Sequence, residues 1–189
     1  MTEIERSSSG PRPTEGAVRE LLSFYYPMHF RIGMELETLM GQGRISRQQS
    51  AMLWLIHSRA NPDGWIRRKA IEARLSTWFE ISNSNISRLL RELSRPPLSL
   101  VTQVENPQSG REKVIRLTKG GERFVEGMIE ASVNYLSGQL AHLSEEELRW
   151  GLGFFALSFG RGPGISASDG PDSRLEVPPR RIARLATQS

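Results

Sequence analysis

ISNSNISRLLREL, the sequence from Ile81 to Leu93, separates onto two sides when it is wound as a helix. Its aliphatic residues recur at the i, i+3, i+4 and i+7 spacing of one helical face: Ile86, Leu89, Leu90 and Leu93. The opposite side carries Ser84, Ser87, Arg88 and Arg91, with Glu92 towards the flank. The pattern predicts a helix that packs one face and exposes hydroxyl groups and positive charge on the other.

The composition of the exposed side favours a role in binding DNA. Solvated surface helices usually interleave Glu with Lys in salt pairs, whereas this side carries short hydroxyls and two Arg residues. Small Ser side chains let a helix enter a DNA groove, where Arg reaches phosphates or guanine acceptors. The alternative is an ordinary amphipathic helix, the commonest kind in globular domains. The neighbouring elements must decide between the two interpretations.

Composition limits the class of protein. A chain of 189 residues with 38% hydrophobic residues is long enough for one compact domain with tails. The net charge of +4 agrees with a polyanionic partner. The absence of cysteine excludes disulfides, thiolate metal sites and cysteine nucleophiles. Because the sequence shows neither a signal peptide nor about 18 consecutive apolar residues, we expect a soluble cytoplasmic protein without a membrane span.

Three helices are expected before Ile81. Residues 1–16 are polar and predicted to be disordered, and a long helix follows from Ala17 to Met40, which Pro27 should kink or split. A capping box, Ser46 with Gln49, starts the second helix, and the turn Asn61-Pro62-Asp63-Gly64 closes it. The third helix should run from about Ile66 to Phe79. Its expected inward residues are Ala70, Ile71, Leu75 and Phe79.

A hairpin and two helices are expected after Leu93. The stretches 100–105 and 112–117 predict strands joined by a small, flexible loop at 106–111, with Arg111 and Lys113 near its tip. Thr118 should cap a long fifth helix, and Ser144 with Glu147 a sixth. These two helices and the first are more apolar than a small domain can cover, which predicts a second copy of the chain. Residues 161–189 are predicted to form a basic, disordered tail.

The order of these elements resembles the MarR family of winged helix-turn-helix transcription regulators over roughly residues 17–160. The closest stretches are ISRLLREL, residues 86–93, and REKVIRLTKGG, residues 111–121. The resemblance implies that Ser82, Asn83, Ser84, Ser87 and Arg88 face the major groove and that Arg111 enters the neighbouring minor groove. It also implies a homodimer held by the terminal helices on a near-palindromic site.

Two departures from the family pattern concern the wing. Ser109 stands where family wings usually carry an acid two residues before the Arg, which suggests a less constrained wing Arg. The segment 95–99 is longer than the tight glycine turn that usually joins the helix to the wing, so the hairpin could be displaced.

The candidate DNA-binding residues are therefore Ser82, Asn83, Ser84, Ser87, Arg88, Arg91, Arg111 and Lys113. The alternative for each is a solvated surface residue. A second candidate site is a pocket for a small aromatic effector lined by Tyr25, His29, Trp54 and His57, although aromatic residues on helices more often belong to the core. His29 and His57 lack the spacing of metal ligands, and Glu145–Glu147 suit a helix start rather than catalysis.

We expect a mostly α fold with a small β-hairpin wing: a winged helix-turn-helix at 43–117, with dimerisation helices at 17–42 and 118–160. The expected function is sequence-specific binding of double-stranded DNA by a homodimer that regulates transcription, as a repressor by occlusion. The alternative is a winged-helix protein-interaction module whose tail or helix face recruits a partner protein. No nucleophile, metal cluster or phosphate loop emerges, so neither an enzyme nor a cofactor is expected.

Overall fold

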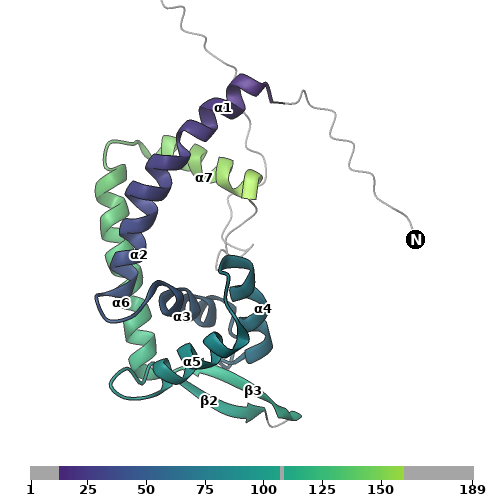
Figure 1. The fold of residues 1–189 in the computed structure, drawn as a ribbon. Helices are drawn as coiled ribbons and strands as arrows, with labels where there is room; N and C mark the ends of the chain where they lie inside the picture. The colour runs from purple at the N-terminus through teal and green to yellow at the C-terminus, as the bar shows by residue number, and fades with distance from the viewer. Residues whose placement is uncertain (1–12, 107–108, 160–189) are drawn as a thin grey trace, which may run out of the picture.

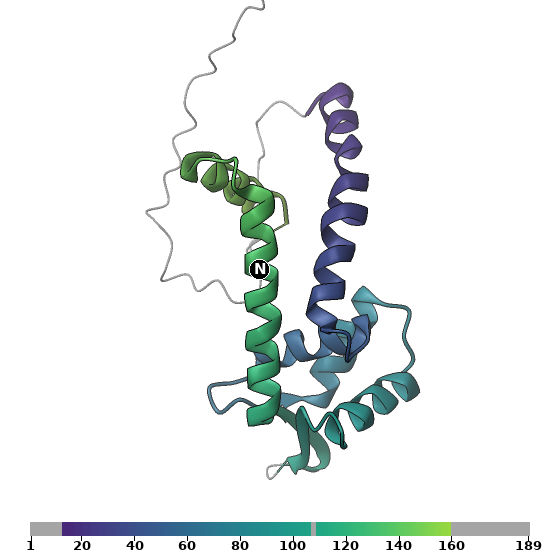
Figure 2. The same cartoon turned by 90° about the vertical axis from the view of Figure 1, so that its left-hand side faces the viewer.

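A computed structural model of the chain describes residues 13–106 and 109–159 (Figure 1). In chain order the elements are α1 (Glu15–Ser23), the π-helix η1 (Pro27–Gly33), α2 (Met34–Gly41), α3 (Arg47–Arg59), β1 (Ile66–Arg67), α4 (Arg68–Trp78), α5 (Asn83–Ser94), β2 (Val101–Asn106), β3 (Ser109–Leu117), α6 (Lys119–Leu140) and α7 (Glu145–Phe159). The helical segments α1, η1 and α2 form a rod that stands beside α6. The helices α3 to α5 and the strands lie at one end of the molecule, and α1 and α7 lie at the other (Figures 1 and 2). The tail predicted at 161–189 lies outside the described residues.

One apolar core joins α3, α4, α5, the sheet and the start of α6. The aliphatic face predicted for α5 is confirmed, because its four residues are at most 2% exposed: Ile86, Leu89, Leu90 and Leu93. They pack in one cluster with the buried residues of the neighbouring elements, among them Met52, Leu53, Ile71, Leu75, Ile115 and Val125. At about 25 cal/mol per Å² of apolar surface removed from water, this burial fixes how α5 is rotated. Its polar side therefore faces outward.

The third helix begins later than predicted, because Ile66 and Arg67 form a short strand. This strand, β1, pairs antiparallel with β3, with Ile66 opposite Ile115, so the sheet has the order β1-β3-β2. The side chain of Ile66 is 6% exposed, so burial and pairing with β3 favour an extended backbone over another helical turn. The expectation that Ala70 points inward is wrong. Ile71 and Leu75 form the buried stripe of α4, and Ala70 lies outside it and is exposed.

The hairpin is longer than predicted at its tip. Ser109 already pairs with Asn106, so residues 109–111 belong to β3 instead of to the loop expected at 106–111. Only residues 107–108 separate the strands, and these two lie outside the described residues. The hairpin remains attached to α5, because Leu100 N–H donates to the carbonyl of Leu93 at 2.7 Å. Thus the longer segment 95–99 does not detach the hairpin from α5.

The predicted helix from Ala17 to Met40 is three consecutive helical segments. It starts at Glu15, because the Thr14 side chain accepts a hydrogen bond from Ala17 N–H, so the predicted disorder does not extend to residue 16. Residues 1–12 lie outside the described part of the chain. Pro27 is the first residue of η1. Because proline has no N–H to donate to the preceding turn, the α-helical hydrogen bonding is interrupted there, and the wider hydrogen bonding of a π-helix follows. The predicted interruption of the helix is therefore present, with α1 ending at Ser23 and the π-helix beginning at Pro27.

The start of α6 lies very close to the start of the hairpin. Thr118 accepts from Gly121 N–H at 3.0 Å, which is the predicted cap, and its hydroxyl also donates to the carbonyl of Ser99 at 2.8 Å. Thr118 N–H donates to the carbonyl of Leu100 at 3.0 Å. A Cβ atom on Gly121 would lie 2.0 Å from that same oxygen. Only glycine allows this approach.

The remaining predicted caps are also confirmed. Ser46 and Gln49 form both hydrogen bonds of a capping box at α3. Ser144 and Glu147 form the same pair of hydrogen bonds at α7. The Glu147 carboxylate accepts from the backbone N–H of Ser144 and from its hydroxyl, and these two bonds, the first more than the second, lower the pKa of Glu147. No helix in the described part of the chain is long and apolar enough to cross a lipid bilayer.

Candidate nucleic-acid interface

The polar face of α5, defined as Ser84, Ser87, Arg88 and Arg91, lies on the outside of the domain. Ser84, Arg88 and Arg91 are exposed and Ser87 is half-buried. Ser82 and Asn83 are exposed at the start of the helix, and Ser82 is its N-cap, because its hydroxyl accepts from Asn85 N–H at 3.2 Å. Structure thus places the α5 candidates on one surface. Whether they contact DNA stays a prediction.

Ser87 is less available than its position in the sequence suggests. Its hydroxyl donates to the carbonyl of Asn83 at 2.8 Å and accepts a hydrogen bond from the Arg68 guanidinium of α4. Arg68 also pairs with Glu72 at 2.7 Å, and both side chains are mostly buried. Ser87 therefore helps to hold α5 against α4, in addition to any contact with a ligand.

Arg88 is held along its own helix. Its Nε and Nη2 atoms donate to the Asn85 side-chain oxygen at 3.1 and 2.7 Å, and its Nη1 atom donates to the Glu92 carboxylate. Sequence reasoning missed Asn85 as part of the site and placed Glu92 only towards the flank. The i−3 and i+4 spacing of these residues from Arg88 is the signal that could have indicated the contacts.

Glu92 links Arg88 to the interior of the domain. One carboxylate oxygen accepts from Arg88, and the other accepts from Gln49 Nε2 at 2.9 Å. Gln49 is 6% exposed, and its own oxygen accepts from Ser46 N–H at 2.8 Å in the α3 capping box. The contact joins residues 43 positions apart, so no local pattern could have predicted it.

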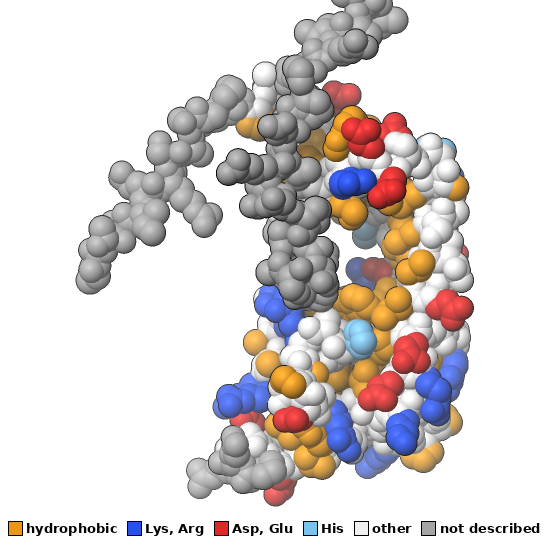
Figure 3. Space-filling model, turned by 180° about the vertical axis from the view of Figure 1, so that it is seen from behind, with side chains coloured by type: hydrophobic (Ala, Val, Ile, Leu, Met, Phe, Trp, Pro, Cys, Tyr) orange, Lys and Arg blue, Asp and Glu red, His pale blue; other side chains and the backbone are white. Residues whose placement is uncertain are grey.

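The wing candidates lie on β3. Lys113 is exposed opposite Glu105, and Arg111 is part of the strand, although its side chain lies outside what the structure describes. The sheet carries two further basic residues, Arg67 on β1 and Arg116 on β3. Arg67 is exposed 3.7 Å from Glu112, and Arg116 lies 4.6 Å from the centre of the Trp65 ring. Figure 3 shows Lys and Arg side chains gathered on this half of the molecule.

The residues proposed for a ligand pocket form two ring pairs. Tyr25 stacks on His29 with ring centres 5.6 Å apart, and Trp54 lies 5.9 Å from His57. A cavity of about 280 Å³ between α2, α3 and α4 includes Trp54 but none of the other three residues; its lining is Glu37, Met40, Arg47, Ser50, Ala51, Trp54, Trp78 and Phe79. Thus this cavity does not bring the four candidates together.

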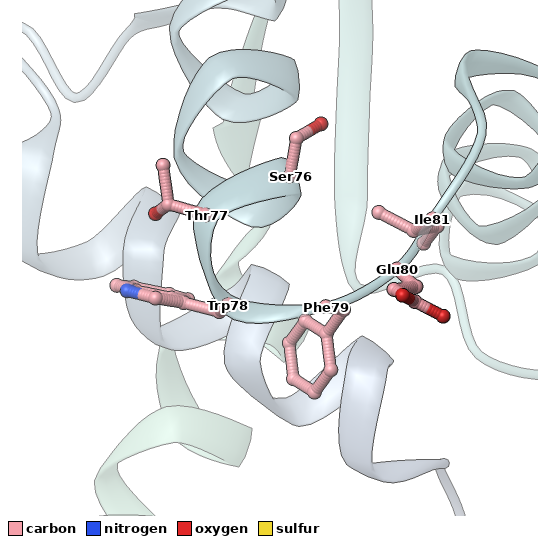
Figure 4. Close-up of a pocket in the computed structure, with 6 residues that line it drawn as sticks. All are labelled: Ser76, Thr77, Trp78, Phe79, Glu80 and Ile81. Carbon is pink, nitrogen blue, oxygen red and sulfur yellow. The ribbon is translucent and has the colours of Figure 1, made fainter.

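A second hollow, of about 440 Å³, lies at the end of α4 (Figure 4). It is lined by consecutive residues of the last helical turn and the connection to α5: Ser76, Thr77, Trp78, Phe79, Glu80 and Ile81. Within the described residues there is no group of three or more acidic or histidine side chains that could bind a metal ion.

Large apolar side chains cover the N-terminal rod and α7. We call these the exposed apolar faces: Val18, Leu21, Leu22, Tyr26, Met28 and Phe30 on the rod and Leu148, Trp150, Leu152, Phe154 and Leu157 on α7. Their exposure is high for apolar residues, reaching 63% for Leu22 and 86% for Leu157. Contiguous apolar surface of this kind usually marks a protein–protein contact.

Comparison with known proteins agrees with this geometry. Residues 45–121 match the family model described as a winged helix DNA-binding domain. No curated protein sequence matches the chain.

Solved structures share the fold over most of the chain. A DNA complex of Sco3205, a MarR family transcriptional regulator from Streptomyces coelicolor, has a TM-score of 0.57 at 13% identity and covers 79% of this chain and 89% of its own. A mutant of MepR from Staphylococcus aureus bound to an oligodeoxyribonucleotide has a TM-score of 0.51 at 20% identity, with 77% and 96% covered. A mutant of MarR from E. coli has a TM-score of 0.55 at 16% identity, with 78% and 98% covered. The fold class predicted from the sequence is confirmed.

Proposed function

Because the chain contains a winged helix DNA-binding domain and has the fold of the MarR-family regulators, as the sequence resemblance predicted, we propose that it regulates transcription by binding duplex DNA. We propose further that it acts as a homodimer on a near-palindromic site in the cytoplasm, and that it represses by occluding the promoter. The supporting observation is the polar face of α5, which lies on the outside of the domain that matches the family model, with Ser84, Arg88 and Arg91 exposed. No catalytic activity and no cofactor are assigned.

In this proposal α5 enters the major groove and the wing reaches the adjacent minor groove. The contacts would come from Ser82, Asn83, Ser84, Ser87, Arg88, Arg91, Arg111 and Lys113. The exposure of Arg88, Arg91 and Lys113 supports this assignment, because exposed cations suit a polyanion. The base-contacting helix would lie within 43–117, between dimerisation regions at 17–42 and 118–160.

A second copy of this chain is the proposed partner of the exposed apolar faces. The rod and α7 carry them at the end of the molecule away from α5, so a dimer there leaves both copies of α5 accessible (Figure 1). Two recognition helices on one side of B-DNA must sit about 34–36 Å apart to enter successive major grooves. A two-fold axis through the apolar faces would supply the palindromic symmetry, and the proposed dimer requires that it also place the two copies of α5 at this spacing.

A small aromatic effector remains part of the proposal. Two ring pairs, Tyr25 with His29 and Trp54 with His57, provide apolar surfaces with polar edges, though on separate parts of the chain. A ligand that binds only the folded protein raises its melting temperature, by an amount that grows with the logarithm of the ligand concentration divided by the dissociation constant. A thermal-shift screen of small phenolic and planar compounds tests this point, and a screen with no stabilising compound contradicts it.

The function itself is tested by selecting binding sites from random duplexes with the full-length protein. A recovered consensus site should be bound far more tightly than unrelated duplex, typically by 10³-fold or more at physiological salt. The affinity should also fall steeply with salt concentration. Equal, weak binding of all duplexes would favour the alternative, a winged-helix module that recruits a partner protein.

Arg88→Ala is expected to weaken binding to the selected site by roughly 5- to 150-fold, the value of one bidentate Arg–base contact. Binding to unrelated duplex should fall much less. The matched control is Arg19→Ala, because Arg19 also forms an exposed i, i+4 ion pair, with Glu15 at 2.8 Å, but lies on α1. Fluorescence anisotropy at constant salt measures both. Equal affinities for Arg88→Ala and the wild type would remove Arg88 from the interface.

A further inference from the structure

The hydrogen bonds around Arg88 lead to an inference that rests on the proposed function and specifies its chemistry. A guanidinium group has five N–H donors. Three of them are occupied here, by Asn85 twice and by Glu92 once. This leaves one donor on each terminal nitrogen of a side chain that is 55% exposed. Two donors on adjacent nitrogens match the O6 and N7 acceptors that guanine presents in the major groove.

The position of the guanidinium favours a base over a phosphate. Asn85, one turn before Arg88, and Glu92, one turn after it, hold the guanidinium along the surface of α5. In a complex in which α5 lies in a groove, a guanidinium kept on the helix surface is near the base edges, while the phosphates line the edges of the groove. Arg91 carries no comparable restraint among the described residues and is the better candidate for a phosphate contact.

The orientation of Glu92 is itself fixed from inside the domain. The Gln49 oxygen accepts from Ser46 N–H, so the amide cannot be turned around without placing an NH₂ group against another donor. Gln49 Nε2 must therefore point to Glu92, at 2.9 Å. Because Gln49 is 6% exposed, water competes little for this bond.

We propose that Glu92 is a specificity-determining residue that, with Asn85, positions Arg88 to read a single guanine in each half-site. Glu92 does not touch the DNA. It restricts a long side chain that would otherwise lose several rotamers on binding, and preorganisation of this kind increases affinity for the matching base. The buried amide of Gln49 holds the Glu92 carboxylate in place, and Glu92 in turn restrains the guanidinium of Arg88.

Whether Glu92→Gln raises or lowers the affinity for the selected site distinguishes this proposal from a purely electrostatic effect of the Glu92 charge. Removing a negative charge beside a polyanion should tighten binding to every duplex. If Glu92 positions Arg88, the same substitution should instead weaken binding to the selected site by roughly tenfold and abolish the preference for guanine at one base pair. Binding to unrelated duplex should stay level or rise.

The experiment uses the full-length protein and the selected site, together with duplexes in which each G·C pair is replaced in turn. Asn85→Ala is a second variant, because it removes the other restraint on Arg88 and leaves the Gln49 contact in place. Glu80→Gln is the control, since it removes the same charge from an exposed position before α5. Both test variants should lose discrimination at the base pair that Arg88→Ala also affects, and the control should lose none.

Each outcome bears on a different claim. Tighter binding of Glu92→Gln to all duplexes with guanine discrimination intact overturns the positioning role and leaves the proposed function standing. Wild-type protein that selects no site overturns the proposed function and this inference together. Circular dichroism and thermal melting of the variants should match the wild type, so a loss of discrimination cannot be attributed to unfolding.

Discussion

Gly121→Ala should destabilise the winged domain by about 3 kcal/mol, the upper end of the range for overpacked sites. The added Cβ atom would lie 2.0 Å from the backbone oxygen of Leu100 and 3.3 Å from the Leu117 side chain. A carbonyl in the backbone cannot rotate away as a side chain can. The start of α6 must therefore move from the hairpin, which breaks the hydrogen bonds that Thr118 makes to Ser99 and Leu100.

Gly120→Ala provides a closely matched control for this prediction. The nearest atoms to a Cβ at Gly120 are the Thr118 hydroxyl at 3.5 Å and the Ser99 oxygen at 3.9 Å, which are ordinary contacts. Because alanine restricts the unfolded chain more than glycine, this variant should be neutral or up to about 1 kcal/mol more stable. Urea unfolding of both variants at one protein concentration measures the difference. Similar stabilities for the two would contradict the close approach at Gly121.

A double substitution in the exposed apolar faces, Leu22→Glu with Leu157→Glu, is expected to convert the proposed dimer into a folded monomer. Both side chains are largely exposed in the single chain, so the change should not disturb its own core. In a dimer each would place an unpaired carboxylate in an apolar contact, at a cost of several kcal/mol. Loss of the second half-site contact should then reduce affinity for the selected site by roughly 10²-fold or more.

Sedimentation velocity and DNA binding measured on the same samples test this prediction. Ser23→Glu with Ser158→Glu is the control, because these exposed residues adjoin Leu22 and Leu157 and would carry the same new charge without replacing an apolar side chain. The control should remain a dimer with near-native affinity. A dimer that survives the leucine substitutions would mean that the two copies associate through another surface.

Local patterns predicted the parts of the fold that depend on neighbours in sequence. The aliphatic face of α5 and the caps of α3, α6 and α7 could be predicted because their partners lie three or four residues away. The strand β1 could not, since two residues show no periodicity and Ile66 is extended only because Ile115 lies opposite. Gly121 was visible as part of a motif, but the need for glycine there depends on the distance to Leu100.

The candidate site divides in the same way. Arg88 was predicted from its place on the helix, whereas its restraint by Glu92 depends on Gln49, which comes from another helix. The expected ligand pocket grouped four aromatic and histidine residues by type. Their distribution over different helices, with His57 and Tyr25 exposed, could be known only from the tertiary structure.

The pairing of Ile66 with Ile115 also has a mechanical effect on any bound duplex. It ties the base of the hairpin to the α3–α4 connection, on the edge of β3 opposite β2, so this part of the wing is held against the rest of the domain. With the base of the wing held in this way, we expect the protein to adjust little to a groove of the wrong width. The nucleic acid must bend or narrow instead, and stiff sequences resist such deformation by roughly 1–6 kcal/mol, so flexible steps that no side chain touches should be enriched in the operator.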